Sequence, residues 1–436
     1  TVQYDSWQEM MPYKSVTGRF DQRTKTKNFS GALSFVDCGM FSTDFDQIDT
    51  WSASAYTATN LVFKKSMFAF ENMIISIGSN ITSSGTYSAS MPTTTNLFQN
   101  LISSSSGSFI YNGTTLTTPY TSTTTTTADN WLITPQGTGY FIPKGNDSIE
   151  VRYDNQSSPN YTGSDYMAPI NSIPAAKAYL NHGFKPSSKS YSFVVIPATN
   201  TTQMQTMASQ LANGGGSVYQ ILSQSSSVHA LLYKPLNITA YSFFSAASNL
   251  TYGIVKSTTS PHLLMDKYDA TLNRHYFAIS DPNLHPVTDA MYGWIATSNQ
   301  TTLTLTGEWK AINDVVGVTF SAPISGQTLV TITMYNGEPI YFGAKSPTDV
   351  ATVNDIVDSK WATFIKDADN IKVDFTENLN SNVSLQICSL NGILLYKQNN
   401  TSKTVPVIVS TKNLQHGFFL CTVNDSQRTR TFKFVN

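Results

Sequence analysis

Charged side chains are scarce in this sequence. Only 13% of its 436 residues are Asp, Glu, Lys or Arg, and the formal net charge is -1. A chain so close to neutral has no overall attraction to nucleic acid or to an anionic membrane surface. The composition therefore predicts neither as a partner, and any binding driven by charge must come from a local group of charged residues.

Cysteine and long apolar runs are scarce as well. The three cysteines permit at most one internal disulfide, which excludes a disulfide-stapled scaffold. No run approaches the roughly 18 apolar residues of a membrane-spanning helix. The first residues, TVQYDSWQEMMPY, contain neither a basic nor an apolar leader region, so we expect a mature or truncated chain.

The common cofactor motifs are also missing. The sequence contains no CxxC or HExxH pattern and its six histidines are scattered, so no dedicated zinc site is expected. It contains no GxGxxG or Walker loop and no GxSxG nucleophile element. We therefore predict a protein without a cofactor or a resident metal.

Residues that favour β-structure are abundant, including 24 Phe and 22 Tyr. Aromatic and β-branched residues fit pleated surfaces, and Ser, Thr and Asn supply turns. Two hairpins are predicted, one turning at Glu71-Asn72 and one at Asn112-Gly113, and a third strand pair surrounds Gly137. Helix is scarce. Residues 201–216 favour one, capped by Thr201 or Thr202, and 347–361 favour a second.

Linker-like stretches divide the chain into three parts. KSTTSP (256–261) and GAKSPTDV (343–350) suggest domains at 1–255, 256–345 and 346–436. The first part is too long for a small sandwich and fits a broad, many-stranded one.

Several collinear motifs resemble the β-half of the polysaccharide lyases of family eight, which include chondroitin AC, hyaluronate and xanthan lyases. KKSMFAFENMIISIGSNI resembles the family pattern KKxWFxFDxEIxxLGxxI. The other matching segments, in family order, are SWQEMMP (6–12), PTTTNLFQ (92–99), WLITPQGTGYFIPKG (131–145), AYLNHGFKPSSKSYSFVVIP (178–197), HLLMDKYDATLNRHYFAISDPNL (262–284) and TLTLTGEWK (302–310). The resemblance covers about residues 1–342.

The resemblance implies an all-β fold for this chain. A large antiparallel super-sandwich, similar to galactose mutarotase, is followed by two small β-sandwich domains. In the family, a helical toroid carries the catalytic Asn, His, Tyr and Arg and eliminates at uronic acids. A base removes the proton next to the carboxylate, and Tyr protonates the leaving oxygen. The motifs of that toroid are missing here, so we predict that no residue of this chain is catalytic.

Three functions remain open. The first is the β-sheet half of a secreted uronic-acid polysaccharide lyase, which closes the substrate cleft and binds an anionic polysaccharide but is inactive alone. The second is a non-catalytic carbohydrate-binding or adhesive surface protein derived from the lyase fold. The third is an independent mutarotase-like enzyme, which would need a histidine and a carboxylate in one concavity, with His182 as the leading candidate.

Candidate substrate-binding residues fall into two groups. The basic segment, residues 13–28, occupies the position of a family loop that reaches the cleft, and its cations suit carboxylates or sulfates. Asn181-His182 matches a family element, which either lines the cleft or forms a turn with a packed histidine. Trp7 and Trp131 either stack on sugars or anchor a core. The basic segment contains Lys14, Arg19, Arg23, Lys25 and Lys27.

The final block resembles the C-terminal sorting domain of the type IX secretion system. Its matching parts are Leu385 to Gly392, Leu414 to Val423 and Lys433 to Val435. The resemblance implies a third β-sandwich and a secreted or cell-surface protein. Cys388 and Cys421 fall in two of its strands, and they form either a disulfide or a pair of free thiols.

The basic segment gives a direct test. Replacing Arg19, Arg23, Lys25 and Lys27 with Ala should weaken binding of an anionic glycan, because fewer cations then meet its carboxylates or sulfates. The dependence of affinity on salt should fall as well, since fewer ion contacts are screened. Affinity is measured by titration at two salt concentrations. An unchanged affinity with an unchanged salt dependence would show that the segment is only a loop.

Overall fold

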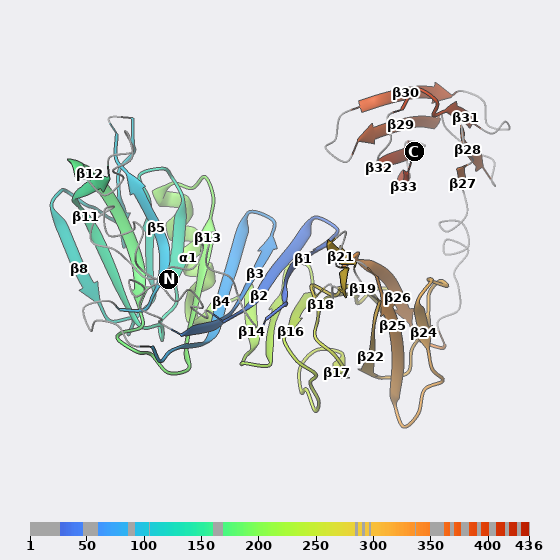
Figure 1. The fold of residues 1–436 in the computed structure, drawn as a ribbon, viewed down its shortest axis with the longest axis horizontal. Helices are drawn as coiled ribbons and strands as arrows, with labels where there is room; N and C mark the ends of the chain where they lie inside the picture. Colours follow the sequence, from blue (N-terminus) through green and yellow to red (C-terminus); the bar gives the residue numbers. More distant parts are fainter. Residues whose placement is uncertain are drawn as a thin grey trace. The chain divides into compact units, whose positions relative to one another are not determined.

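The computed structural model describes residues 27–46, 60–85, 92–103, 105–159, 169–283, 287–289, 293–295, 298–335, 337–348, 362–366, 370–375, 383–389, 394–400, 407–414, 418–424 and 429–435. The chain divides into two compact units, Thr1–Pro347 and Thr348–Asn436. The described elements are antiparallel strands with a single helix, α1 (Thr201–Gly215), so the predicted all-β fold is confirmed (Figure 1).

A 9-stranded first sheet is the centre of the first unit. In spatial order its strands are β1 (Ser30–Phe35), β2 (Cys38–Asp46), β3 (Leu61–Phe70), β4 (Met73–Ser83), β13 (Lys189–Ile196), β10 (Gly139–Ile142), β9 (Asn130–Ile133), β6 (Ile110–Tyr111) and β7 (Thr114–Thr115). The predicted hairpins are confirmed. Glu71 and Asn72 join β3 to β4, and Asn112 and Gly113 join β6 to β7 with φ of 47° and 83°, the positive values that a type I′ turn requires.

Three further sheets complete the first unit, with a short hairpin of β20 (Val287–Asp289) and β21 (Gly293–Ile295). The second sheet contains β5 (Thr94–Leu101), β12 (Pro169–Asn181), β11 (Ser148–Pro159) and β8 (Tyr120–Thr124). The third contains β14 (Tyr219–Gln224), β15 (Val228–Tyr233), β16 (Ile238–Phe243), β18 (His262–Asp269), β19 (Arg274–Ser280), β26 (Ile340–Lys345) and β23 (Lys310–Ala311). The fourth contains β17 (Val255–Thr258), β22 (Asn299–Thr306), β25 (Gln327–Met334) and β24 (Val318–Phe320).

The predicted domain boundary at residue 255 falls between two strands that pair in the third sheet. β16, before the boundary, pairs with β18, after it, along its whole length from Ile238 to Phe243. The boundary therefore does not separate two sheets, and the three-domain division 1–255, 256–345 and 346–436 stays a prediction.

The helix α1 follows β13 and packs against β9, β10 and β14. Its cap is Asn200 and not Thr201 or Thr202 as predicted. The Asn200 side chain accepts from the backbone N–H of Gln203 at 3.0 Å, and the Gln203 side chain accepts from the Asn200 N–H at 3.1 Å. This reciprocal capping box satisfies two backbone donors that the helix cannot satisfy itself. Residues 349–361, which cover most of the second predicted helix, lie outside the described residues.

The first sheet has an apolar core on each face. One core, which includes Phe98, Leu132, Val151 and Leu180, lies between it and the second sheet. The other, which includes Phe70 and Met265, joins it to the third sheet and α1. A third core fills the space between the third and fourth sheets. Burial of apolar surface from both faces therefore makes the first sheet the common wall of the unit.

A buried polar group crosses the core between the first and third sheets. His229 on β15 contacts Ser66 on β3 through Nδ1 and Ser79 on β4 through Nε2, each at 2.8 Å. Ser66 also donates to Ser242 on β16 at 3.0 Å, and Ser42 on β2 lies 2.5 Å from the same Ser242 hydroxyl. We call these five residues the serine–histidine network. Each has 3% or less of its surface exposed, so the hydrogen bonds replace lost contacts with water.

The second unit is a small β-sandwich. One sheet contains β27 (Ala362–Lys366), β28 (Asn370–Phe375) and β31 (Val407–Ser410). The other contains β30 (Leu394–Asn400), β29 (Val383–Ser389), β32 (Phe418–Asn424) and β33 (Thr429–Val435). Val373 and Val409 of one sheet and Leu385 and Val423 of the other share a core.

The two cysteines of this unit are free thiols. β29 and β32 are neighbours, but the register pairs Cys421 with Ile387 and Cys388 with Leu420. Successive residues of a strand point to opposite faces of the sheet, so the two thiols lie on opposite faces and cannot form the disulfide. Cys421 is in the core, where burial raises the pKa of its thiol to about 12.

The buried histidines predict a loss of stability in acid. Burial, with a smaller effect of Lys64, lowers the pKa of His229 from 6.5 to about 3, and burial lowers that of His262 to about 4. Between these values and pH 6.5 the unfolded chain binds more protons. The free energy of unfolding should therefore fall with decreasing pH by about 1 kcal/mol per pH unit for each histidine.

Replacing His229 with Gln tests this dependence. The substitution leaves the network serines partly unpaired and should cost about 1–3 kcal/mol at neutral pH. The slope of stability against pH should become shallower by about 1 kcal/mol per pH unit, because one titrating group is gone. Urea denaturation at several pH values measures both quantities, and His262→Gln gives an independent second case. Equal slopes in the variant and the parent would contradict the assignment.

Candidate functional site

Polar residues meet where β12 ends. Asn181 is its last residue, and His182 follows with a side chain that is 0% exposed. His182 Nδ1 lies 2.7 Å from Asp147 Oδ2, and its Nε2 lies 2.8 Å from Thr95 Oγ1. Lys189 on β13 approaches Asp147 Oδ1 at 2.6 Å. We call Thr95, Asp147, His182 and Lys189 the His182 cluster, and it ties the second sheet to β13 of the first.

The backbone around His182 is held as firmly as its ring. The His182 N–H donates to Thr93 O, and the Thr93 N–H donates to Gly183 O, both at 2.9 Å. Gly183 has φ of 82°, a value that glycine adopts without strain. These contacts support the interpretation of Asn181-His182 as a turn with a packed histidine, because both ring nitrogens are engaged within the protein.

The charge of the cluster rests on Asp147. Burial alone would raise the pKa of its carboxyl, but the hydrogen bonds from His182 and Lys189 outweigh burial and lower that pKa. Asp147 is therefore ionised at neutral pH, and it orients the His182 ring by accepting from Nδ1–H.

Asn181 belongs to a different network from its neighbour. Glu150 on β11 lies directly opposite Tyr179 on β12. The Tyr179 hydroxyl donates to Glu150 Oε2 at 2.5 Å, and the Asn181 amide donates to Glu150 Oε1. Since Ile149 and Val151 on either side of Glu150 belong to the core, Glu150 faces away from it. The two residues that the sequence grouped thus serve separate contacts.

The predicted basic segment is described only at its end. Lys14, Arg19, Arg23 and Lys25, together with Trp7, lie outside the described residues. Lys27 is described, and its Nζ lies 3.6 Å from Asp44 Oδ2, with 44% of its side chain exposed. Asp44 also pairs with the buried Lys64, so Lys27 adds a second cation to one carboxylate.

The aromatic candidate that is described contributes to packing. Trp131 on β9 packs against the core between the first and third sheets, and its backbone N–H donates to Asn112 Oδ1 at 2.8 Å. Glu71, at the predicted hairpin turn, accepts from the Tyr233 hydroxyl of β15. Both residues therefore have structural contacts that account for their placement.

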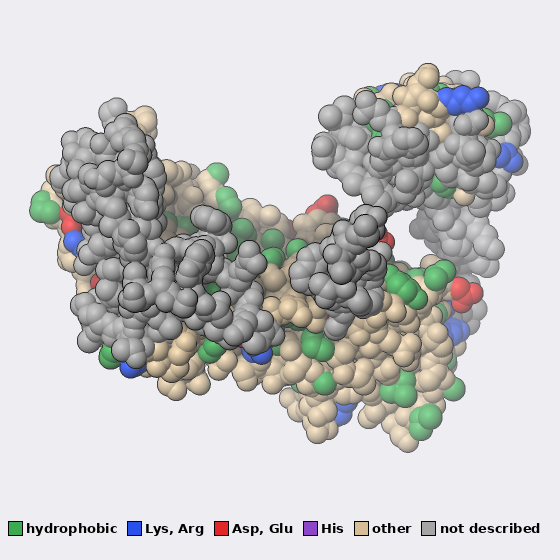
Figure 2. Space-filling view, viewed as in Figure 1, with side chains coloured by type: hydrophobic (Ala, Val, Ile, Leu, Met, Phe, Trp, Pro, Cys, Tyr) green, Lys and Arg blue, Asp and Glu red, His purple; other side chains and the backbone are tan. Residues whose placement is uncertain are grey.

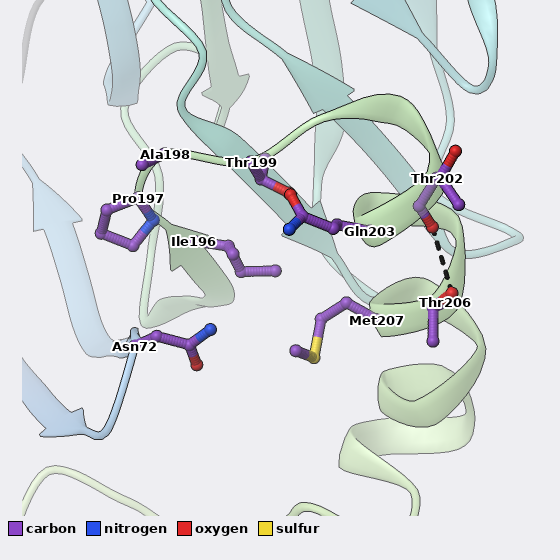
Figure 3. A pocket seen from close by; sticks show the side chains of 9 residues that line it. All are labelled: Asn72, Ile196, Pro197, Ala198, Thr199, Thr202, Gln203, Thr206 and Met207. Atoms are coloured by element: carbon purple, nitrogen blue, oxygen red, sulfur yellow. Dashed lines mark hydrogen bonds between the residues drawn. The ribbon is translucent and has the colours of Figure 1, made fainter.

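A pocket of 300 Å³ opens beside α1. Figure 3 shows Asn72 of the β3–β4 turn and Pro197 on one side, facing Gln203, Thr206 and Met207 of the helix, with Ile196 between them. The described residues that line it carry amides, hydroxyls and apolar groups but no charge. Such a lining suits a neutral polar ligand better than an anionic one.

A histidine–carboxylate pair that the sequence did not single out lies on the third sheet. His275 Nδ1 is 2.8 Å from Asp266 Oδ1, and Tyr268 stacks on the His275 ring with centroids 4.6 Å apart. Burial raises the pKa of Asp266, and His275 opposes that rise. Tyr268 and His275 lie opposite each other across the β18–β19 hairpin. The alternation of side chains along the two strands, on either side of the turn at 270–273, was the signal that could have predicted the contact of His275 with Asp266.

The described surface offers little concentrated charge. Figure 2 shows blue and red side chains scattered among green and tan ones on the face in view. Within the described ranges, no group of three or more His, Cys, Asp or Glu side chains is arranged to hold a metal ion. In the same part of the chain, no helix has both the length and the apolar character needed to cross a membrane.

Comparison with known proteins assigns both ends of the chain. Residues 1–208 match the model of the polysaccharide lyase family 8 super-sandwich domain. This match covers just under half of the chain. Residues 367–436 match the model of a secretion system C-terminal sorting domain. The resemblance predicted from the motifs is confirmed, as is the prediction of a secreted or cell-surface protein.

Two curated proteins similar to this chain come from Proteus vulgaris. The chondroitin sulfate ABC endolyase is 28% identical over 282 residues, which are 64% of this chain and 26% of the relative. The chondroitin sulfate ABC exolyase is 24% identical over 336 residues, or 71% of this chain and 31% of the relative. The chain thus spans between a quarter and a third of these relatives.

Solved structures share the fold. A Paenibacillus xanthan lyase matches 97% of this chain and 41% of its own with a TM-score of 0.59 at 16% identity. A Streptomyces coelicolor chondroitin AC lyase in complex with chondroitin sulphate matches 73% of this chain and 36% of its own, with a TM-score of 0.53 at 13% identity. These likenesses concern the arrangement of the sheets.

Replacing Asp147 with Asn should weaken the His182 cluster. Asp147 has a lowered pKa in the folded chain. Its contribution to the free energy of unfolding is therefore present above about pH 4 and is lost as the pH falls through the pKa of the folded chain. We expect a loss of about 1–3 kcal/mol in the free energy of unfolding at neutral pH that shrinks in acid.

Urea denaturation measures this loss. Glu308→Gln, at an exposed position in the loop after β22, is the matched control and should change stability by less than about 0.5 kcal/mol. An Asp147→Asn chain as stable as its parent at neutral pH would show that the cluster does not stabilise the sheets.

Proposed function

We propose that this chain is the β-sheet half of a secreted polysaccharide lyase that eliminates at uronic acids. In this proposal the chain binds the anionic glycan and closes one side of the substrate cleft. The catalytic Asn, His, Tyr and Arg come from a helical domain outside these 436 residues. The observation that carries the proposal is the family 8 super-sandwich at residues 1–208.

The relatives support the choice of substrate class. The curated proteins similar to this chain are chondroitin sulfate lyases, and one structure of similar fold holds chondroitin sulphate. Chondroitin is an anionic polysaccharide that contains uronic acid, the unit at which this elimination takes place. The aligned part of the endolyase is 26% of its length, so most of that enzyme has no counterpart in this chain.

The described histidines support a catalytic centre elsewhere. A general base must come within hydrogen-bond reach of the proton that it removes. The four described histidines are buried, with 4% of His182, 0% of His229, 0% of His262 and 8% of His275 exposed. His182 and Asp147 do form the histidine–carboxylate pair that a mutarotase-like enzyme would need, but Thr95 and Lys189 enclose the pair.

The ultraviolet absorbance of the unsaturated uronide tests the proposal. The chain alone, incubated with chondroitin, hyaluronan or xanthan, should give no signal, because none of its described histidines is exposed enough to reach a substrate. A chain joined at its N-terminal end to the helical domain of a family member should eliminate one of these polymers.

Two results would overturn the proposal. Steady turnover by the chain alone would mean that the sheets carry their own catalytic groups. Glycan binding without any elimination by the joined chain would favour the non-catalytic carbohydrate-binding protein.

A further inference from the structure

A second pocket, of 120 Å³, opens between the first and second sheets. Lys65 of β3 and Tyr191 of β13 line it from the first sheet, and Thr94, Thr95 and Asn96 of β5 line it from the second. It is separate from the pocket beside α1. We call it the Lys65 pocket.

Lys65 supplies the charge of this pocket. Burial lowers the pKa of its ammonium, and no described acid lies within ion-pair distance of it. Its neighbour Lys64 points to the opposite face of the sheet, where it pairs with Asp44 at 2.5 Å. A partly desolvated cation without a counter-ion among the described residues favours an anionic ligand, since an anion would restore the stabilisation that water no longer gives.

Thr95 supplies an acceptor. Its hydroxyl lies 2.8 Å from His182 Nε2, and His182 Nδ1 lies 2.7 Å from Asp147. In the tautomer that donates Nδ1–H to Asp147, Nε2 carries no proton, so the Thr95 hydroxyl donates to Nε2. The remaining lone pairs of Thr95 Oγ1 are then left for a donor in the pocket, such as a sugar hydroxyl. The His182 cluster thus orients a pocket group without entering the pocket.

The Tyr191 ring makes an apolar wall that depends on Gly78. A Cβ at Gly78 of β4 would lie 2.1 Å from the ring, so only glycine leaves room for it. Gly78 pairs directly with Lys65 across β3 and β4. Tyr191 also stacks on Phe193, with centroids 5.6 Å apart, which fixes the ring in place. One wall is therefore rigid and apolar, as in sites that select a ring-shaped ligand.

We propose that the Lys65 pocket binds a single sugar-acid unit, with its carboxylate on the Lys65 ammonium and a neighbouring hydroxyl donating to Thr95. A cation and an oriented acceptor together select a ligand that has both a carboxylate and hydroxyl donors. The assignment of this unit to a uronic acid of the polysaccharide rests on the proposed function. The geometry of the pocket does not depend on that function. In this proposal the pocket anchors the sugar unit, and the elimination takes place on the helical domain.

Calorimetric titration of the full chain with glucuronate, glucose and inorganic sulfate tests the selection. Glucuronate should bind at least about 10-fold more tightly than either of the others, because glucose lacks the charge and sulfate lacks the hydroxyl donors. A chondroitin oligosaccharide with a terminal uronic acid should bind at least as well if the unit belongs to a polymer. Weaker binding of the oligosaccharide would assign the pocket to a free sugar acid.

Two variants locate the binding. Lys65→Met should weaken the binding of glucuronate by about 10-fold or more. Thr95→Val should weaken the binding of glucuronate by about 3- to 10-fold and leave the affinity for sulfate unchanged. Lys144→Met removes an exposed cation of the same unit and is the matched control, with no expected effect. Thermal melting shows whether each variant is folded.

A measurement on the folded parent covers the case in which Lys65→Met does not fold. Reductive methylation keeps each lysine charged, and isotope-labelled methyl groups give one resonance for each modified amine. The partly buried Lys65 should give a resonance shifted from those of exposed lysines, and glucuronate, but not glucose, should move it. The proposal is wrong if glucuronate and glucose bind alike, if Lys65→Met and Lys144→Met behave alike, or if glucuronate moves no buried-lysine resonance. Elimination activity does not enter any of these results, so failure of the proposed function is seen separately.

Discussion

The first unit depends on the contact of His229 with Ser66 and Ser79. The ring nitrogens reach two strands of the first sheet from a strand of the third, each at 2.8 Å. Apolar burial around this contact is the larger source of stability, but it is not directional. A buried polar group without a partner costs about 1–3 kcal/mol, so displaced packings of the two sheets are penalised. The serine–histidine network therefore sets how the third sheet meets the first.

The same first sheet positions the second on its other face. There the His182 cluster links Thr95 of β5 to Lys189 of β13 through Asp147, again with a histidine whose two nitrogens are both engaged. His229 and His182 thus join layers, and their burial keeps them from solvent. A framework of this kind fixes the first three sheets of the first unit relative to one another.

Local features of the fold could be predicted from the sequence, because neighbouring residues determine turns and favour a helix, although the helix cap was placed at Thr201 or Thr202 and not at Asn200. The hairpins at Glu71-Asn72 and Asn112-Gly113 and the helix after β13 are examples. Contacts between distant residues could not be predicted, since Ser66 and His229 are 163 positions apart and Asp147 and His182 are 35 apart. The register of paired strands could not be predicted from the sequence either. A one-residue offset between Cys388 and Cys421 separates their thiols, and no pattern in the sequence reports it.

The pairing of β16 with β18 has a practical consequence for dissecting the protein. All six residues of β16 are buried, and the strand has partners on both sides. A fragment that ends at residue 255 would lack β18, one of the two partners of β16, and would leave β16 as an unpaired, apolar edge strand. Such edges recruit other chains by adding strands, which leads to aggregation. Expression of the super-sandwich in soluble form therefore calls for a fragment that keeps the chain through the first compact unit, to Pro347.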